Sequence, residues 1–337
     1  MAQDLPVYQP IHEAVRPLLD PEYVAFHDKY LQYVLPDDRK VWDGSARTTS
    51  SAWPPTESTP VQVKEVRDLD LGAYDARVWT PDAEKPSRGF PVFLWFHGGG
   101  WAVGSIASGN DICALICRRA ACVVVSVGYR LAPDHPFPAA FDDSVASLRW
   151  VHSAEGAAEL RIDSERIAVG GTSAGGQLAA SLCIQAARLS PPVRLAFQLL
   201  VLPVIDNTAT ASTVWSTRKD APWLTPERMT WYRKMYLANE DDALKWEASP
   251  NLAPEPLLSE SPCTWIAIAE QDLLAPEAEL YASQLRESWK RCGKADSNVL
   301  VKAYAGSTHC TLAFSGILAK GQELLSDAAD QAAAWFA

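Results

Sequence analysis

The sequence predicts an α/β protein built on a mostly parallel sheet that is flanked by helices and carries a helical cap. Continuous apolar runs, such as Pro91–Phe96 and Cys122–Val127, are typical of central strands buried on both faces. Helix-compatible segments alternate with these runs, as in parallel sheets covered on both sides. An aromatic-rich stretch at residues 206–247 then interrupts the alternation. An insertion of this kind between strands favours a cap over an active site.

Composition excludes several classes of function. The 337 residues can bury a large core, as one large domain or as two. The formal net charge of −11 disfavours nucleic acid and anionic membranes as partners. No apolar run of membrane-spanning length occurs, and the first residues lack the basic and apolar regions of a signal peptide. The sequence therefore predicts neither a nucleic-acid partner nor a membrane span, and the small molecule expected as partner follows from the motifs described below.

The seven cysteines indicate a reducing, cytoplasmic compartment rather than a disulfide framework. Cys113, Cys117 and Cys122 come closest to a cluster, but no histidine follows them at metal-ligand spacing. We therefore expect buried thiols and no metal.

The elements follow in order along the chain. Residues 1–58 should form the N-terminal part of the cap, with an amphipathic helix near Tyr23–Tyr33 and a Ser/Thr-rich link between Trp42 and Trp53. The first part of the core, residues 59–205, should contain strands at 61–66, 74–80, 91–96, 122–127, 166–169 and 195–202, and helices at 110–120, 140–153 and 177–187. The inserted cap segment should cover 206–247, and the second part of the core, 248–337, should contain strands at 263–269 and 298–304 and helices at 276–289 and 321–335.

A candidate nucleophile lies in the stretch Gly171-Thr-Ser-Ala-Gly175, which fits the pattern G-x-S-x-G. An apolar strand precedes Ser173 and a helix-compatible run follows it. A serine on a sharp turn between strand and helix exposes its hydroxyl, and the flanking glycines permit the tight backbone. The motif alone is a weak signal, so the rest of the chain must supply a base, an acid and an oxyanion hole.

The base and the acid should follow the serine in the chain. His309 is the one histidine of six that lies after Ser173, in a loop just past the last predicted strand. Asp272 ends a strong apolar strand and heads a loop, where parallel sheets place their functional residues. It would orient His309 and stabilise the imidazolium. The alternatives for the acid are Glu277 and then Glu270.

A glycine run after a buried strand predicts an oxyanion hole. In Trp95-Phe-His-Gly-Gly-Gly-Trp101 the glycines allow backbone N–H groups to converge on one point, as tetrahedral acyl intermediates require. The expected donors are Gly98, Gly99 and Ala174. His97 is expected to brace the loop rather than to react.

Aromatic side chains are the candidates for substrate contact. We expect Trp101, Trp215 and Trp223 to line the substrate site, while the alternative is that such rings only pack the cap onto the body of the protein.

A third motif is Tyr129-Arg-Leu-Ala-Pro-Asp-His-Pro-Phe-Pro-Ala139, which joins His97-Gly-Gly-Gly100 and the serine motif. With these three motifs, the chain resembles the hormone-sensitive-lipase-like family of α/β-hydrolases over about residues 60–337. The resemblance implies the α/β-hydrolase fold with an eight-stranded, mostly parallel sheet. It implies a cap formed by the N-terminal segment and an inserted helical segment, and hydrolysis of carboxylic esters without a cofactor. The family's triad falls on Ser173, Asp272 and His309, its oxyanion donors fall on Gly98, Gly99 and Ala174, and homodimers occur in such proteins.

The chain departs from the family pattern at several positions. Thr172 stands where many members have Asp, Asp134 where Glu is usual, and Leu273 where the segment around the acid usually has Pro. The long N-terminal segment and tryptophan-rich cap resemble fungal members, some of which act in secondary metabolism. The predicted function is a serine esterase acting on short to medium acyl esters or an acylated natural product. A thioesterase, a lactonase, an amidase and a non-catalytic receptor on the same fold are the alternatives.

Overall fold

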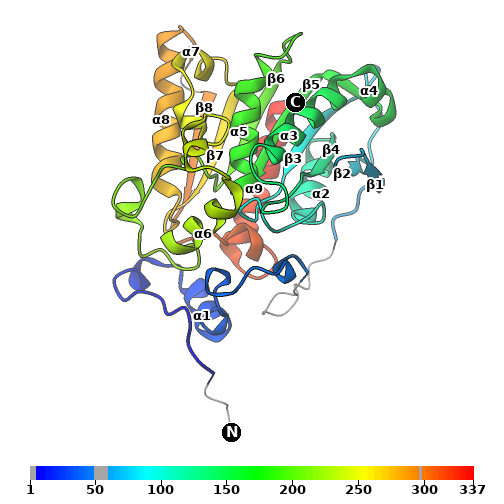
Figure 1. Ribbon diagram of the computed structural model, residues 1–337. Coiled ribbons are helices and arrows are strands. Elements are labelled where there is room, and N and C mark those ends of the chain that lie inside the picture. The colour runs from blue at the N-terminus through cyan, green and yellow to red at the C-terminus, as the bar shows by residue number, and fades with distance from the viewer. Residues whose placement is uncertain (1–4, 49–59, 296–297) are drawn as a thin grey trace.

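One eight-stranded sheet forms the centre of the molecule in the computed structural model, which describes residues 5–48, 60–295 and 298–337 (Figure 1). The strands are β1 (Glu65–Asp70), β2 (Asp75–Thr80), β3 (Phe90–Phe96), β4 (Val123–Gly128), β5 (Ile162–Thr172), β6 (Leu195–Val201), β7 (Cys263–Ala269) and β8 (Val299–Tyr304). Their order across the sheet is β1-β2-β4-β3-β5-β6-β7-β8. β2 runs antiparallel to β1 and β4, whereas β4, β3, β5, β6, β7 and β8 run parallel to one another. The predicted α/β-hydrolase fold with a mostly parallel sheet is confirmed.

Helices cover both faces of the sheet. The helices of the described residues are α1 (Pro21–Lys29), α2 (Asn110–Arg119), α3 (Ala139–His152), α4 (Ala154–Leu160), α5 (Ala174–Ala186), α6 (Pro226–Tyr236), α7 (Glu255–Leu258), α8 (Ala275–Arg291) and α9 (Ala319–Phe336). α2 and α9 pack together on one face, and α3, α5 and α8 pack on the other. No helix in these described ranges is long and apolar enough to cross a bilayer.

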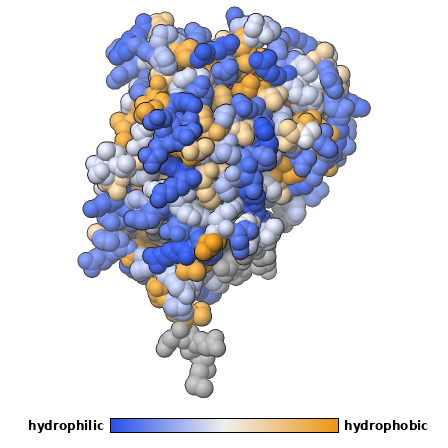
Figure 2. Space-filling model, in the orientation of Figure 1, coloured by the Kyte–Doolittle hydropathy of each residue, from blue (hydrophilic) through white to orange (hydrophobic). Residues whose placement is uncertain are grey.

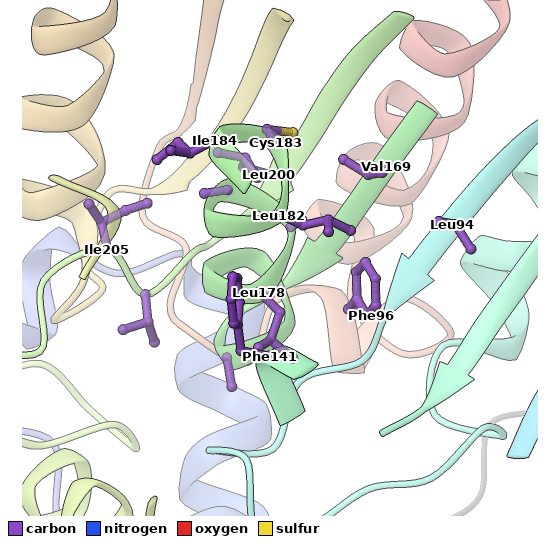
Figure 3. Packing of buried hydrophobic residues seen from close by; sticks show 14 of the residues in the cluster. Leu94, Phe96, Phe141, Val169, Leu178, Leu182, Cys183, Ile184, Leu200 and Ile205 are labelled. Carbon is purple, nitrogen blue, oxygen red and sulfur yellow. The ribbon is translucent and has the colours of Figure 1, made fainter. Parts of the chain in front are cut away.

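Side chains of β3 alternate between the two cores. Leu94 and Phe96 contribute to the core under α5, where Leu178 and Leu182 pack (Figure 3). Trp95 contributes to the opposite core beside α2 and α9. Because both faces are covered, the strand is apolar throughout, which is the pattern that identified it in the sequence. On the side seen in Figure 2, apolar surface residues are scattered among hydrophilic ones.

The N-terminal segment packs on the C-terminal part of the chain. Leu19, Tyr23 and Phe26 form a small apolar cluster with Phe314 and Leu318. Asp20 caps α1 with its side chain, and its backbone N–H donates to the carbonyl of Gly306 at 2.9 Å. α1 therefore lies at the same end of the sheet as α6 (Figure 1).

Several elements differ from the prediction. The strand predicted at 61–66 is instead β1, which begins at Glu65, opposite the last residue of β2, Thr80. Just before it, the N–H of Lys64 donates to the carbonyl of Thr80 at 3.0 Å. The helix predicted near Tyr23–Tyr33 begins at Pro21, which is favoured at the first turn, and gives way to a 3-10 turn at Leu31–Tyr33. α4 was not expected from the sequence, and Ser153 caps it by accepting from the N–H of Gly156. Trp53, most of the Ser/Thr-rich link and the expected boundary at residue 58 lie outside the described residues.

Candidate active site

Ser173 occupies a strained turn between β5 and α5. Its φ of 55° and ψ of −120° lie in a region that non-glycine residues rarely adopt. The turn is packed against the end of β3: a Cβ on Gly175 would lie 2.0 Å from the carbonyl oxygen of Phe96, and one on Gly171 would lie 2.3 Å from that of Gly175. The two glycines are therefore required by close backbone contact, and the serine hydroxyl is held out beyond the strand ends.

His309 lies beside this hydroxyl. Its Nε2 is 2.9 Å from the Oγ of Ser173. The loop that carries the histidine follows β8 and is fixed internally, since the N–H of Thr308 donates to the Oγ1 of Thr311 at 3.0 Å. The imidazole is 13% exposed, so it is accessible from one side while its other side is held.

Asp272 holds the other nitrogen of the imidazole. Its Oδ2 lies 2.8 Å from the Nδ1 of His309, and its Oδ1 accepts from the N–H of Leu274 at 3.1 Å. The carboxylate is almost completely buried. Since the carboxylate can only accept, Nδ1 carries the proton and Nε2 is free to accept the serine proton.

The two alternative acids lie elsewhere. Glu270 accepts from the N–H of Gly306 at 2.9 Å and so supports the loop of the histidine from outside the site. Glu277 is buried on α8 and accepts from the N–H of Ile205 and from the indole of Trp215. Neither carboxylate contacts His309 among these hydrogen bonds, which leaves Asp272 as its partner.

The glycine run after β3 faces the serine turn. A Cβ on Gly98 would lie 3.3 Å from the Cβ of Ser173, so this backbone passes directly in front of Ser173. Within the described residues, no group accepts a hydrogen bond from the backbone N–H of Gly98, Gly99 or Ala174. The expected donors are therefore uncommitted, as an anion site requires.

His97 braces this loop. Its Nδ1–H donates to the carbonyl of Gly98 at 2.7 Å, and its ring stacks on Tyr129 at 4.4 Å. The Tyr129 hydroxyl in turn donates to the backbone carbonyl of His97 at 2.7 Å. Burial lowers the pKa of His97 to about 4, so the ring is neutral at ordinary pH. It acts as a support and holds no charge near the site.

A cavity of about 420 Å³ opens onto Ser173 and His309. α6 and the residues just before it supply one wall, formed by Trp223, Leu224, Arg228, Met229 and Tyr232. The opposite wall includes Trp95, Ile112 and Leu325 from the sheet, α2 and α9. Polar side chains also line it, among them Asn110, Asp111 and Ser315.

Of the three tryptophans expected to contact substrate, the structure brings Trp223 alone to this cavity. Trp101 is buried, donates to the side chain of Gln177 at 3.0 Å and stacks on Tyr236 at 4.1 Å. Trp215 is buried against Glu277. Both indoles are interior because each finds an acceptor and an apolar surface there, so their expected place in the substrate site is corrected.

Sequence reasoning did not single out Met229 and Tyr232 as lining residues. Their spacing of three on a helix places both on one face, and this periodicity could have indicated them.

Comparisons with known proteins show a shared sequence family and fold. A family model described as the alpha/beta hydrolase fold matches residues 93–313. An AB hydrolase superfamily protein of Schizosaccharomyces pombe is 37% identical over 97% of both chains. The carboxylesterase NlhH of Mycobacterium tuberculosis is 33% identical over 80% of this chain and 83% of its own. Among solved structures, an esterase of Pyrobaculum calidifontis superposes with a TM-score of 0.70 at 33% identity, over 81% of this chain and 86% of its own. The carboxylesterase EstE1, cloned from a metagenomic library, gives 0.72 at 34% identity, over 83% of this chain and 92% of its own.

Proposed function

Since the chain belongs to the hormone-sensitive-lipase-like family of α/β-hydrolases and is an ester hydrolase, we propose that it cleaves small-molecule carboxylic esters through a triad of Ser173, His309 and Asp272. One observation carries the proposal. Three side chains from three separate strand ends form a continuous hydrogen-bonded chain, with contacts of 2.9 Å and 2.8 Å. Such a chain activates a serine hydroxyl, which is a weak nucleophile on its own.

The reaction proceeds through an acyl-enzyme. The Oγ of Ser173 attacks the ester carbonyl while the Nε2 of His309 takes the hydroxyl proton. Asp272 stabilises the imidazolium that forms. His309 then gives the proton to the leaving alkoxide, and the alcohol departs. Water repeats the sequence on the acyl-enzyme and releases the carboxylic acid and free serine.

Charge on the carbonyl oxygen develops in front of the glycine run. The N–H groups of Gly98, Gly99 and Ala174 are the proposed donors to this oxyanion. The proposal is supported by their lack of other acceptors among the described residues and by the closeness of Gly98 to Ser173. Loss of one such donor typically costs on the order of a hundredfold or more in kcat.

The cavity supports short to medium acyl groups, or a small acylated natural product, as substrates. Its volume of about 420 Å³ lies at the lower end of the range for small-molecule sites. Its one lining cation, within the described residues, is Arg228, and that guanidinium is engaged by Asp38 and Gln9. A neutral substrate therefore fits better than one bearing a second carboxylate.

Hydrolysis of p-nitrophenyl esters from acetate to long acyl chains tests the proposal, with wild type measured beside Ser173→Ala. We expect activity that decreases with chain length, and a loss in kcat on the order of 10⁴ to 10⁶ in the variant. Hydrolysis by Ser173→Ala at the wild-type rate would refute the triad.

The same hydrolysis assay, extended to other acyl compounds, separates the esterase from a thioesterase, a lactonase, an amidase and a receptor. Thioesters, lactones and anilides of the same acyl groups, measured in parallel, show whether the bond cleaved is an oxygen ester. A folded wild-type protein that binds small molecules without turnover would instead be a receptor on this fold.

A further inference from the structure

The cap wall of the cavity contains a single uncommitted polar group among its described residues, the hydroxyl of Tyr232. Trp223, Leu224 and Met229 present mainly apolar surface. Arg228 is committed, because its guanidinium donates to the carbonyl of Trp223 at 2.7 Å and to Gln9 at 2.9 Å, and faces Asp38. The Tyr232 hydroxyl makes no hydrogen bond with any residue that the structure describes.

The ring of Tyr232 is fixed against the glycine run. Gly100 has a φ of 56°, and a Cβ on it would lie 2.2 Å from the Cδ1 of Tyr232. The tyrosine ring therefore fills the space that a side chain at position 100 would need. Trp231 packs edge-on against the same ring at 4.9 Å. A ring held on two sides gives its hydroxyl a defined position.

The hydroxyl is poised as a donor. Burial raises the pKa of Tyr232, so the phenol keeps its proton throughout the range in which a serine esterase works. Binding is weakened when a bound molecule displaces water from a protonated phenol without offering an acceptor in its place. A site of this kind discriminates strongly between a substrate with an acceptor and one without.

We propose that Tyr232 is a specificity-determining residue, whose hydroxyl donates a hydrogen bond to a second acceptor oxygen of the substrate, such as an ether or keto oxygen. This oxygen is separate from the ester group that is cleaved. The inference rests on the proposed ester hydrolysis and names its substrate class: esters carrying a further oxygen on the acyl or the alcohol part, in preference to esters of plain hydrocarbon chains.

Two pairs of esters of equal length test the inference. The acyl pair is p-nitrophenyl 5-methoxypentanoate and p-nitrophenyl heptanoate, and the alcohol pair is 4-methoxybutyl acetate and hexyl acetate. Within each pair, an ether oxygen replaces a methylene far from the reacting carbonyl. The quantity measured is the ratio of kcat/KM between the two members, so intrinsic reactivity cancels when variants are compared.

Tyr232→Phe keeps the ring that covers Gly100 and removes only the hydroxyl. We expect the preference for the methoxy ester to fall about fivefold in at least one pair, the discrimination that one uncharged hydrogen bond supplies. The matched control is Tyr281→Phe, because Tyr281 is a buried tyrosine on α8 that lies outside the cavity lining. An unchanged ratio in both pairs, or an equal change in the control, would overturn the inference.

A binding measurement separates this inference from the proposed function. Calorimetric titration of Ser173→Ala with the four esters gives affinities without turnover. Tighter binding of a methoxy ester, lost when Tyr232→Phe is added, supports the role of Tyr232 even if wild type hydrolyses none of the esters. Equal affinities within both pairs would reject that role even if wild type hydrolyses all four.

Discussion

The indole Nε1 of Trp215 donates a hydrogen bond of 2.7 Å to the Oε2 of Glu277 in the interior of the protein. The other oxygen of the same carboxyl accepts from the N–H of Ile205, also at 2.7 Å. The preceding residue, Val204, donates its N–H to the carbonyl of Ser173 at 3.1 Å and lines the cavity. Glu277 thus supports the nucleophile turn through the loop after β6, although it does not touch the reacting atoms.

Glu277 should make stability depend on pH. Burial raises its pKa to about 8, while the donors around it and the nearby Arg233 lower it in part. The folded protein therefore holds a proton that the unfolded chain releases between about pH 4.5 and pH 8. The resulting stabilisation is complete at low pH and is lost as pH rises through this window.

Urea unfolding of wild type and Glu277→Gln from pH 5 to pH 8 measures this effect. The free energy of unfolding of wild type should fall more steeply with pH than that of the variant, by at most about 1.4 kcal/mol per pH unit. Parallel pH profiles for the two proteins would show that the carboxyl is already ionised at pH 5.

Asp272→Asn should reduce kcat by a factor on the order of 10⁴, because an amide at this position favours the wrong imidazole tautomer. The matched control is Glu270→Gln, two residues away, where the amide oxygen can still accept from Gly306. This control should retain kcat within about threefold, since the lost charge is not on the triad. A larger loss in the control than in Asp272→Asn would assign the acid to Glu270. The measurement is steady-state hydrolysis of p-nitrophenyl acetate.

Gly100→Ala should lower kcat/KM by at least about tenfold, because the new Cβ would lie 2.2 Å from Tyr232 and one of the two must move. The control is Gly72→Ala. Gly72 also has a positive φ, of 89°, but nothing lies within 4 Å of an added Cβ. Both variants should lose about 1 kcal/mol of stability from backbone strain. If the two variants hydrolyse esters equally well, contact between position 100 and α6 does not matter for catalysis.

Arg47→Ala should destabilise the protein by on the order of 2 kcal/mol and lower kcat. The guanidinium donates to the carbonyls of Ala102 and Ala132, at 2.9 Å and 2.8 Å, and pairs with Asp134. It thereby ties the N-terminal segment to the residues that follow the glycine run. Arg39→Ala removes the same charge from an exposed position of the same segment and should change the unfolding midpoint in urea little. Equal midpoints for the two variants would contradict the anchoring role.

The core of the fold could be predicted from the sequence because its signals are local. A central strand buried on both faces is continuously apolar, as Pro91–Phe96 is, and its neighbours follow the same pattern. The positions of Ser173, Asp272 and His309 at strand ends follow from the same alternation, and the structure brings the three within hydrogen-bond distance.

The direction of the aromatic side chains could not be predicted, since it depends on distant partners. Trp101 has a φ of 59°, which turns the chain so that its indole reaches Gln177 and Tyr236. Trp215 points inward because Glu277, on a separate helix, offers an acceptor. Nothing next to either tryptophan in the sequence signals these partners. By contrast, the spacing of three between Met229 and Tyr232 is visible in the sequence and places both side chains on one face of a helix.

The packing of α1 on the loop after His309 has a consequence for the order of events during synthesis. Asp20 is translated well before Gly306, to whose carbonyl it donates, and before Phe314, on which this region packs. A chain translated only as far as α5 thus carries Ser173 without His309, and α1 without the surface it covers. Activity should appear only after the segment around His309 has left the ribosome.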